Sequence, residues 1–585
     1  MIRMVKKLLK SVRQYKKAAI LTPITVTFEV ILEVLIPFIM ANLIDYGIDK
    51  GDMNYIITMG LALAGCCVIS LLCGVLSGRY AAISSAGFAA NLRHDIFNKV
   101  QQFSFSNIDK YSTSSLITRL TTDVTNVQNS FQMITRIAVR SPMMLIFAVI
   151  MAFNVNSELS LIFLGAIPVL GVGLWLIMSK VHPIFTRAFK KYDKLNNVVQ
   201  ENLRGVRVVK SYVRQEYEDK KFKSASGEIF KDLVSAEKVL AFNAPLMHFV
   251  MYASILLISY FGAVMVVQSG DNAALGMTTG QLMSLLSYVT QILMSLMMLS
   301  MIFVMITMSR ASAERIVEVL DEEPSIKSPK NPVTQVASGD IEFENVCFGY
   351  SEKRGSSVLK NVNISIKQGQ TVGIIGGTGS SKSSLVQLIP RLYDVTEGSV
   401  KVGGVDVREY ELTALRKEVA MVLQKNELFS GSIKENLRWG NQNATDEELE
   451  HACRVACADE FIRTFPDGYD THIEQGGTNV SGGQKQRLCI ARALVAKPKI
   501  IIMDDSTSAV DTRTDSMIRD AFKNELPDTT KLIIAQRLSS VQDADLILVM
   551  DEGAVVAMGD HEQLMESCEI YREVYQSQNR GGEQA

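Results

Sequence analysis

The sequence has no excess of charge of either sign. It contains 60 lysine and arginine residues and 61 aspartate and glutamate residues, which gives a net charge of −1. No concentrated basic field lies outside the N-terminus, and this argues against a nucleic-acid partner. The eight cysteines lack the paired CxxC spacing of a zinc site, so we interpret them as small buried hydrophobic residues.

The N-terminus also lacks the small-residue cleavage site of a secretory signal peptide, and its first apolar run is too long for one. Residues 1–17 include seven basic and no acidic residues. Because basic residues mark the cytoplasmic side of a membrane, we expect a cytoplasmic N-terminus, with residues 1–17 as an interfacial helix.

Long apolar runs dominate the first half of the chain. Residues up to about 310 contain runs that can cross a bilayer, whereas residues from about 340 onward have the pattern of a soluble α/β domain. An even number of spans returns the chain to the cytoplasm, where the soluble domain must lie. Six spans are predicted, at residues 18–46, 54–80, 135–154, 159–179, 241–268 and 281–308.

The connections between these spans differ in length. The loops after the first, third and fifth spans are short, whereas residues 85–136 and 180–238 are long, polar and helical in pattern. We expect these two segments to continue the spans as helices on the cytoplasmic side. A helix of about 25 residues would project about 40 Å, far enough to contact the soluble domain.

A linker separates the two halves. Residues 309–320 continue the sixth span as an amphipathic helix, and a proline-containing stretch follows. The predicted division is an N-terminal helix at 1–17, a transmembrane domain at 18–320, a linker at 321–339, a soluble domain at 340–578 and a tail at 579–585.

Ionisable residues inside the predicted spans are unusual. Glu29 and Glu33 lie one turn apart on the same face of the first span. One interpretation is that these glutamates attract a cationic substrate to a cavity. The other is that they are ordinary carboxylates that line the domain or lie at the membrane interface near the outer leaflet. In the methionine-rich sixth span, Met294 and Met298 are candidates for a surface that adapts to varied apolar ligands, although ordinary helix packing also explains methionines.

The soluble domain contains a phosphate-binding loop. TVGIIGGTGSSKSSLVQLI predicts a strand, a glycine-rich turn and a helix. In such a turn the backbone N–H groups bind phosphates, Lys382 meets the β- and γ-phosphates, and Ser383 offers a hydroxyl to Mg²⁺. Ser381 replaces the last glycine of the motif, and it is small enough that we expect binding to survive. The loop consists of Gly376, Gly377, Thr378, Gly379, Ser380, Ser381, Lys382, Ser383 and Ser384.

Two further segments belong to the same chemistry. Asp504 follows an apolar strand. An aspartate at the end of a buried strand beside a phosphate loop typically holds Mg²⁺, so Asp504 is predicted to do so. A second helix is predicted to begin within NVSGGQKQRLCIARAL. The backbone N–H groups and the dipole at its N-terminus form a second phosphate-binding end. One domain can hardly present both ends to a single nucleotide, so two domains must sandwich it. The residues that open this helix are Ser481, Gly482, Gly483 and Gln484.

Together these motifs resemble the ATP-binding cassette (ABC) transporter family over essentially the whole chain. Outside the soluble domain the matches are NLRHDIFNKVQ, ENLRGVRVVKSYVRQEYE and ASAERIVEVL. The resemblance implies an exporter-type half-transporter: an α-helical six-span transmembrane domain fused to an α/β P-loop ATP-binding cassette, with ATP and Mg²⁺ as cofactors. It also implies a multi-pass protein of the bacterial cell membrane, with the N-terminus and the cassette in the cytoplasm.

The resemblance assigns roles within the cassette. Tyr350 matches the aromatic residue that stacks on adenine, and Gln424 matches the Q-loop glutamine that joins Ser383 and Asp504 at Mg²⁺. VSGGQ matches the signature, SAVD ending at Asp511 the D-loop, and IIAQRLS the switch segment.

Two positions depart from the family pattern. In a hydrolysing cassette of this family a glutamate follows the Mg²⁺-binding aspartate, and a switch histidine contacts the γ-phosphate; here these positions are Asp505 and Gln536. Aspartate loses about 1.5 Å of reach, and an error of about 1 Å can cost a general base about a hundredfold in rate. Glutamine donates a hydrogen bond but carries no imidazole charge. We therefore predict a site that binds ATP well and hydrolyses it poorly.

The pattern resembles the degenerate-site subunit of a heterodimeric multidrug exporter. The intact signature would complete the active site of a second half-transporter that carries the glutamate and the histidine, and that site would perform most of the hydrolysis. The implied activity is ATP-driven efflux of amphipathic, drug-like compounds across the lipid bilayer of the cell membrane. ATP binding would close the cassettes and favour an outward-facing cavity, and hydrolysis would reset it.

Other interpretations stay open at this stage. The chain could form a homodimer that exports a lipid or a peptide, although no cysteine-peptidase domain precedes the first span, which disfavours a peptide-processing exporter. It could also be a non-hydrolysing subunit that only senses ATP. The six-span domain favours transport over that regulatory role.

Overall fold

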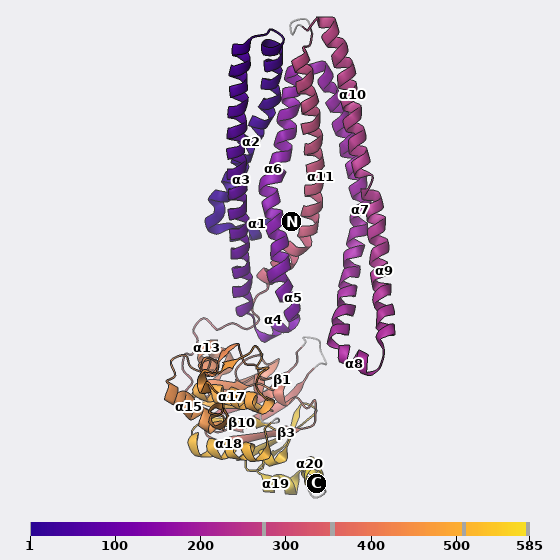
Figure 1. Cartoon of the computed structure of the whole chain (residues 1–585). Helices are drawn as coiled ribbons and strands as arrows, with labels where there is room; N and C mark the ends of the chain where they lie inside the picture. Colours follow the sequence, from indigo (N-terminus) through magenta and orange to yellow (C-terminus); the bar gives the residue numbers. More distant parts are fainter. Residues whose placement is uncertain (1, 272–275, 351–356, 506–509, 581–585) are drawn as a thin grey trace. The chain divides into compact units, whose positions relative to one another are not determined.

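The computed structural model describes residues 2–271, 276–350, 357–505 and 510–580, and it divides into two compact units (Figure 1). The first unit consists of Met1–Gln101 and Thr113–Glu322, and the second of Gln102–Ser112 and Glu323–Ala585. The division after Glu322 lies two residues beyond the predicted end of the transmembrane domain. Residues 102–112 belong to the second unit although they lie between two predicted spans.

The described residues of the first unit form helices joined by short turns, with no strand among them, and they include six helical segments long and apolar enough to cross a membrane. The predicted number of spans is therefore confirmed. Helix α2 packs against α3, α6 against α11, and α7 against α9 and α10. The helices are α1 (Ile2–Leu9), α2 (Lys16–Asn42), α3 (Met53–Gln101), α5 (Thr113–Thr118), α6 (Val124–Val155), α7 (Ser157–Arg204), α8 (Val206–Ser211), α9 (Gln215–Leu240), α10 (Asn243–Ser269) and α11 (Thr279–Asp321).

The predicted cytoplasmic extensions are helical. α3 continues far beyond its predicted span, and α7 continues into a long arm that α9 retraces (Figure 1). The arm turns at Gly205 into the short helix α8. At the opposite end of the unit, Thr278 and Gln281 form a capping box that begins α11, which satisfies backbone N–H groups that a helix start leaves unpaired.

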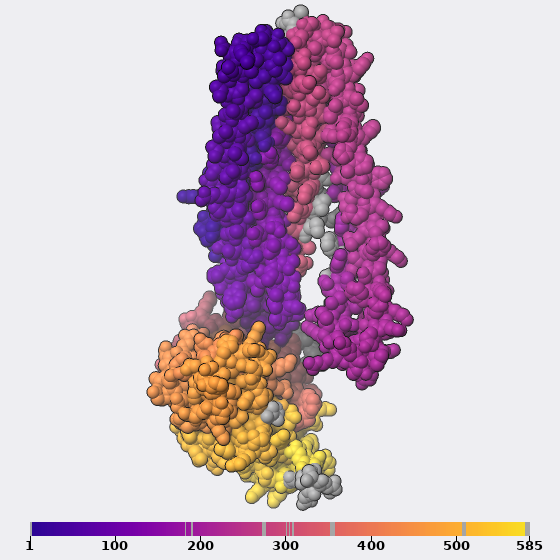
Figure 2. Space-filling model, in the orientation of Figure 1, coloured from indigo at the N-terminus to yellow at the C-terminus, as the bar shows by residue number. Residues whose placement is uncertain are grey.

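The surface of α3 is apolar along its predicted span. Helix α3 belongs to the indigo part of the surface in Figure 2. Its exposed large side chains include Ile57, Leu61, Val68, Leu71 and Val75. Soluble proteins rarely expose a continuous apolar surface of this length. Because a bilayer solvates such side chains, their exposure agrees with a membrane location.

The second unit contains two main β-sheets. A four-stranded sheet has the order β2-β1-β4-β5, and a six-stranded sheet has the order β12-β11-β3-β10-β9-β6. In the larger sheet only β12 runs antiparallel to its neighbour. The strands are β1 (Ile341–Phe348), β2 (Leu359–Ile366), β3 (Thr371–Gly376), β4 (Glu397–Val402), β5 (Val405–Asp406), β6 (Val419–Val422), β9 (Ile500–Asp504), β10 (Thr530–Ile534), β11 (Leu546–Asp551) and β12 (Ala554–Gly559), with a small pair formed by β7 (Gly431–Ser432) and β8 (His472–Ile473).

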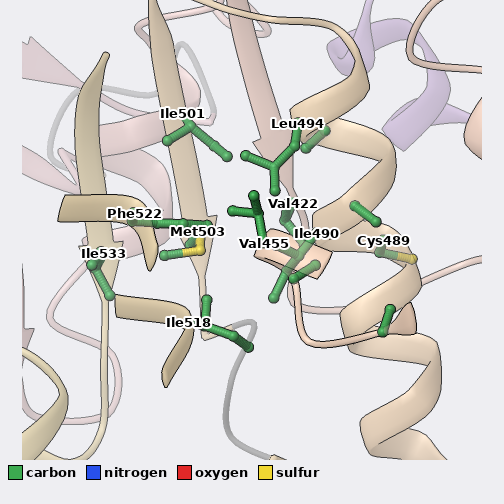
Figure 3. Close-up of a cluster of buried hydrophobic side chains, with 14 of the residues drawn as sticks. Val422, Val455, Cys489, Ile490, Leu494, Ile501, Met503, Ile518, Phe522 and Ile533 are labelled. Atoms are coloured by element: carbon green, nitrogen blue, oxygen red, sulfur yellow. The ribbon is translucent and has the colours of Figure 1, made fainter. Parts of the chain in front are cut away.

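Helices cover the larger sheet and bury its parallel strands. Strands covered on both faces read as nearly continuous apolar runs, and β9 and β10 are buried along their whole length. Figure 3 shows part of this core, where strand residues such as Met503 and Ile533 lie near Ile518 and Phe522 of a helix. The helices of this unit are α4 (Phe105–Lys110), α12 (Lys382–Gln387), α13 (Leu412–Glu418), α14 (Ile433–Leu437), α15 (Asp446–Val455), α16 (Asp459–Ile462), α17 (Gly482–Val495), α18 (Thr512–Glu525), α19 (His561–Ser567) and α20 (Glu569–Arg580).

The cysteines follow the expected pattern only in part. Cys453, Cys489 and Cys568 are buried in the core of the second unit, as predicted. Cys67 is exposed on α3, within a helix long and apolar enough to cross a membrane. All eight thiols are free.

Candidate nucleotide-binding site

Four neighbouring parallel strands deliver the candidate residues to one edge of the larger sheet. The phosphate loop follows β3, Gln536 follows β10, Asp504 ends β9, and Gln424 follows β6. The carboxyl ends of parallel strands meet at the same edge, which is where open α/β sheets bind ligands. The fold therefore brings together residues that lie more than 150 positions apart in the sequence.

The phosphate loop is tightly turned. Gly376 has φ 156° and no room for a Cβ, because the carbonyl oxygen of Met550 lies against it. Lys382 Nζ donates to the carbonyl oxygens of Gly376 and Gly377, each at 2.9 Å, and to Ser380 Oγ at 3.2 Å. Burial lowers the pKa of Lys382, and the nearby carboxylates oppose that shift. The ammonium group is thus held at the loop, in a position to meet a phosphate.

Ser381 is in a conformation that favours glycine. Its φ of 71° and ψ of 24° lie in the left-handed region, which costs a residue with a Cβ about 1–2 kcal/mol. Serine is therefore tolerated at this position with backbone strain. The strain is a physical reason why the motif has glycine here.

Ser383 and Asp504 form the pair that suits Mg²⁺. Ser383 Oγ donates to Asp504 Oδ1 at 2.9 Å, so a hydroxyl and a carboxylate oxygen converge at the loop. Mg²⁺ prefers hard oxygen ligands and usually takes only one or two from protein beside phosphate and water. Burial raises the pKa of Asp504 above its ordinary value, and the hydrogen bond from Ser383 opposes this shift. The donor set fits the ion.

The two residues that depart from the family pattern contact each other. Gln536 Nε2 donates to Asp505 Oδ2 at 2.6 Å, and Gln424 Nε2 approaches the same oxygen at 3.4 Å. Asp505 has φ 51°, a left-handed backbone conformation that is strained for a residue with a Cβ. A water molecule that needed this oxygen as a base would compete with both amides for it.

Tyr350 is linked to a residue that the motifs did not reveal. Its hydroxyl lies 2.9 Å from Ser384 Oγ, and its ring packs edge to face against Tyr393 with centroids 5.1 Å apart. The hydroxyl of Tyr393 donates to Asp109 Oδ2 of α4 at 2.6 Å, and Phe105 of α4 packs on the same ring. Burial raises the pKa of Tyr393, and the bond to Asp109 adds to the shift. The candidate adenine residue and segment 102–112 are therefore joined through one side chain.

The signature residues begin a helix, as expected. Ser481 is the N-cap of α17; it accepts a hydrogen bond from the backbone of Gln484, and the Gln484 side chain accepts one from the backbone of Ser481. Gly482 and Gly483 form the first turn. Their backbone N–H groups are thus presented at a helix N-terminus, where an anion is stabilised.

The D-loop is described only at its end. Asp511 is the N-cap of α18, and hydrogen bonds from Thr514 lower its pKa. Ser508 and Ala509 of the predicted SAVD segment lie outside the described residues.

In the first unit, Glu29 and Glu33 share one arginine. Arg140 of α6 donates a hydrogen bond from Nη1 to Glu29. Its Nη2 donates to both carboxylate oxygens of Glu33, at 2.8 and 2.7 Å. Ser77 of α3 also donates to Glu29, at 3.3 Å. The two carboxylates thus connect α2 to α3 and α6. Arg140 lies within the predicted third span. A search of the predicted spans for a basic residue that could pair with Glu29 and Glu33 would therefore have found it.

The two methionine candidates lie on an exposed face of α11. Met294 is 54% and Met298 40% exposed. Both are separate from the nucleotide residues in the chain and belong to the other unit.

Comparison with known proteins agrees with this architecture. Residues 19–308 match the ABC transporter transmembrane region, and residues 359–508 match the ABC transporter cassette. The "Uncharacterized ABC transporter ATP-binding protein YfiB" of Bacillus subtilis is 35% identical, with 98% of each chain covered. The "Uncharacterized ABC transporter ATP-binding protein MT1311" of Mycobacterium tuberculosis is 34% identical, with 97% of each covered. The structure of a bacterial Atm1-family ABC exporter with ATP bound has a TM-score of 0.79 at 23% identity, with 98% of each chain covered.

These findings define a class of protein: a six-span membrane domain of the exporter type fused to a P-loop cassette. The chain belongs to the ABC transporter family. It is a multi-pass membrane protein with a cytoplasmic ATP-binding domain, and the predicted fold class is confirmed.

Proposed function

We propose that this chain is one half of a heterodimeric ABC exporter, and that it contributes a site that binds ATP but hydrolyses it poorly. ATP-driven export follows from the family. The observation that carries the finer proposal is the hydrogen bond between Gln536 and Asp505 at 2.6 Å.

The contact engages both unusual residues at once. A general base must accept a proton from a water molecule placed within about 3 Å of it. Asp505 Oδ2 instead accepts from the amides of Gln536 and Gln424. The shorter side chain and the engaged oxygen both work against hydrolysis at this site.

The parts that bind nucleotide support the other half of the proposal. Lys382 lies at the phosphate loop, and the oxygens of Ser383 and Asp504 converge for Mg²⁺. Tyr350 keeps a half-exposed ring beside the loop, with 53% of the residue exposed. A binding site whose candidate base accepts hydrogen bonds from two amides fits a site that retains ATP.

The signature supports a role for a partner. Ser481, Gly482, Gly483 and Gln484 open α17 as an intact second phosphate-binding end. In the sandwich that the two ends require, this end serves the nucleotide held by the other chain. The proposed partner is a second half-transporter with the glutamate and the switch histidine that this chain lacks.

Native mass spectrometry of the tagged chain, purified from its own membrane in detergent, tests the partnership. We expect a 1:1 complex with a second ABC half-transporter that carries glutamate and histidine at the positions of Asp505 and Gln536. A complex containing only two copies of this chain would contradict the proposal.

The cargo proposed for this exporter is an amphipathic, drug-like compound. Met294 and Met298 give α11 an exposed, unbranched apolar surface of the kind that adapts to different ligands. Glu29 and Glu33 place two carboxyl groups around the Arg140 guanidinium, and these carboxyl groups are the feature proposed to attract a cationic group.

Efflux from proteoliposomes tests the charge component. With both glutamates replaced by glutamine, the efflux of a cationic dye should fall more than that of a neutral dye of similar size. Equal losses for both dyes would assign Glu29 and Glu33 to helix packing alone.

A further inference from the structure

Helix α20, at the C-terminal end of the cassette, contacts the switch segment. The side-chain amide of Gln578, on α20, forms hydrogen bonds with the backbone of Gln536 and of Leu538. Its Nε2 donates to the carbonyl oxygen of Gln536 at 2.9 Å, and its Oε1 accepts from the N–H of Leu538 at 2.8 Å. One side chain therefore fixes two backbone points of the segment that carries Gln536.

α20 is itself anchored to the cassette. Tyr571 is fully buried, and its hydroxyl lies 2.7 Å from Nδ1 of His561. Val574 and Tyr575 pack against the main hydrophobic core of the unit. The helix is drawn in yellow near the C-terminus in Figure 1. Because these contacts are apolar and buried, α20 provides a fixed point from which Gln578 can act.

A second contact joins the same elements. Gln542, shortly after the switch segment, lies with Nε2 3.4 Å from Nε2 of His561, and the His561 ring packs on Tyr571 and Tyr575 with centroids 5.7 and 5.3 Å apart. The C-terminal helices therefore contact the switch segment at Gln536 and Leu538 and the chain just after it at Gln542.

We propose that Gln578 is a positioning residue for the nucleotide site: it sets the backbone of the switch segment and so aims the Gln536 side chain at Asp505 and at the γ-phosphate of bound ATP. The distance of 2.6 Å between Gln536 Nε2 and Asp505 Oδ2 depends on where the Gln536 backbone lies. Gln578 holds that backbone by its carbonyl oxygen, while the phosphate loop and Tyr350 lie on other elements. Loss of Gln578 should therefore affect the sensing of the γ-phosphate and leave the rest of the nucleotide contacts intact.

The test compares Gln578→Leu with Gln576→Leu in the full-length chain in lipid nanodiscs. Gln576 is a matched control, because it is an exposed glutamine on the same helix and has no hydrogen bond among the described contacts. Hydrogen exchange at the Leu538 amide should become about fivefold faster in Gln578→Leu, the effect of losing one hydrogen bond, and stay unchanged in Gln576→Leu. The affinity for Mg-ATP should fall about fivefold, whereas that for Mg-ADP, which has no γ-phosphate, should not change.

Two results would overturn the proposal. Equal exchange at Leu538 in both variants would show that Gln578 does not hold the segment. Equal weakening of Mg-ATP and Mg-ADP would show a general structural role. Should Gln578→Leu fail to fold, Gln578→Glu serves instead: it keeps the acceptor for the Leu538 N–H but loses the donor to Gln536, so it should keep slow exchange at Leu538 and still lose selectivity for ATP. The readouts concern binding to this chain, so they are independent of whether the chain pairs with a second subunit.

Discussion

Restoring the two family residues should raise ATP hydrolysis above that of the unmodified chain, which we propose hydrolyses ATP poorly. The perturbation is the pair Asp505→Glu and Gln536→His, made singly and together. In the unmodified chain the Asp505 carboxylate is short by one methylene and accepts the Gln536 amide at 2.6 Å. Asp505→Glu alone lengthens the side chain but leaves the amide donor in place to hold it.

The expected magnitudes follow from that contact. A misplacement of about 1 Å costs about a hundredfold in rate, and one methylene supplies about 1.5 Å of reach. We expect each single variant to raise ATP turnover by less than about threefold, and the double variant to raise it by about a hundredfold. Since the residues are in direct contact, their effects should be strongly non-additive.

The assay is steady-state ATP hydrolysis by the purified chain in nanodiscs at saturating Mg-ATP. The chain has an intact signature, so two copies of the double variant hold every part of a hydrolytic site. Lys382→Ala in the double-variant background is the control, and it should remove the gained activity. Full restoration by Asp505→Glu alone, or no gain in the double variant, would refute the reasoning.

Three further predictions concern other contacts. Arg140→Gln should leave the almost buried Glu29 carboxylate without its charged partner and destabilise the membrane domain by about 3 kcal/mol in thermal unfolding. Adding Glu29→Gln should recover part of the loss, and no recovery would contradict the pairing. Tyr393→Phe removes the hydroxyl that donates to Asp109 at 2.6 Å, so dye efflux should fall about fivefold while the ATP affinity stays unchanged. An equal loss of ATP affinity would contradict a role for Tyr393 in linking segment 102–112 to ATP binding. Burial raises the pKa of Asp504, so this carboxyl gains a proton at a higher pH than an ordinary aspartate does. The increase in ATP affinity that Mg²⁺ provides should therefore become smaller as the pH falls toward that raised pKa. Calorimetric titration of ATP with and without EDTA measures this increase, and an increase that does not change with pH would contradict the prediction.

The sequence was sufficient for the architecture because each element follows from a local pattern. Apolar runs of membrane length predict six spans, and six are found. Asp504 at the end of an apolar strand, and Ser481 before a helix, lie where strand and cap patterns place them. The sequence also shows that serine replaces glycine at position 381, but only the structure gives the positive φ that strains the backbone there.

The contacts between distant residues could not be predicted in the same way. Nothing local indicates that the Gln578 amide reaches the backbone of Gln536, or that Tyr393 donates to Asp109 across 284 positions of the chain. These contacts depend on how helices and sheets pack, and a hydrogen-bonding side chain has many potential partners until the packing is known. The sequence therefore predicted the residues of a candidate nucleotide site, and the structure supplied the contacts between them.

The most direct test of the central claim is the ATPase rate of the unmodified, purified chain in lipid nanodiscs, with ATP binding and oligomeric state measured in the same sample. The account predicts negligible turnover with retained ATP binding, because the Asp505 carboxylate is short and engaged by Gln536. Brisk turnover by a homodimer would contradict it, since these two residues would then suffice for hydrolysis and no second subunit would be needed.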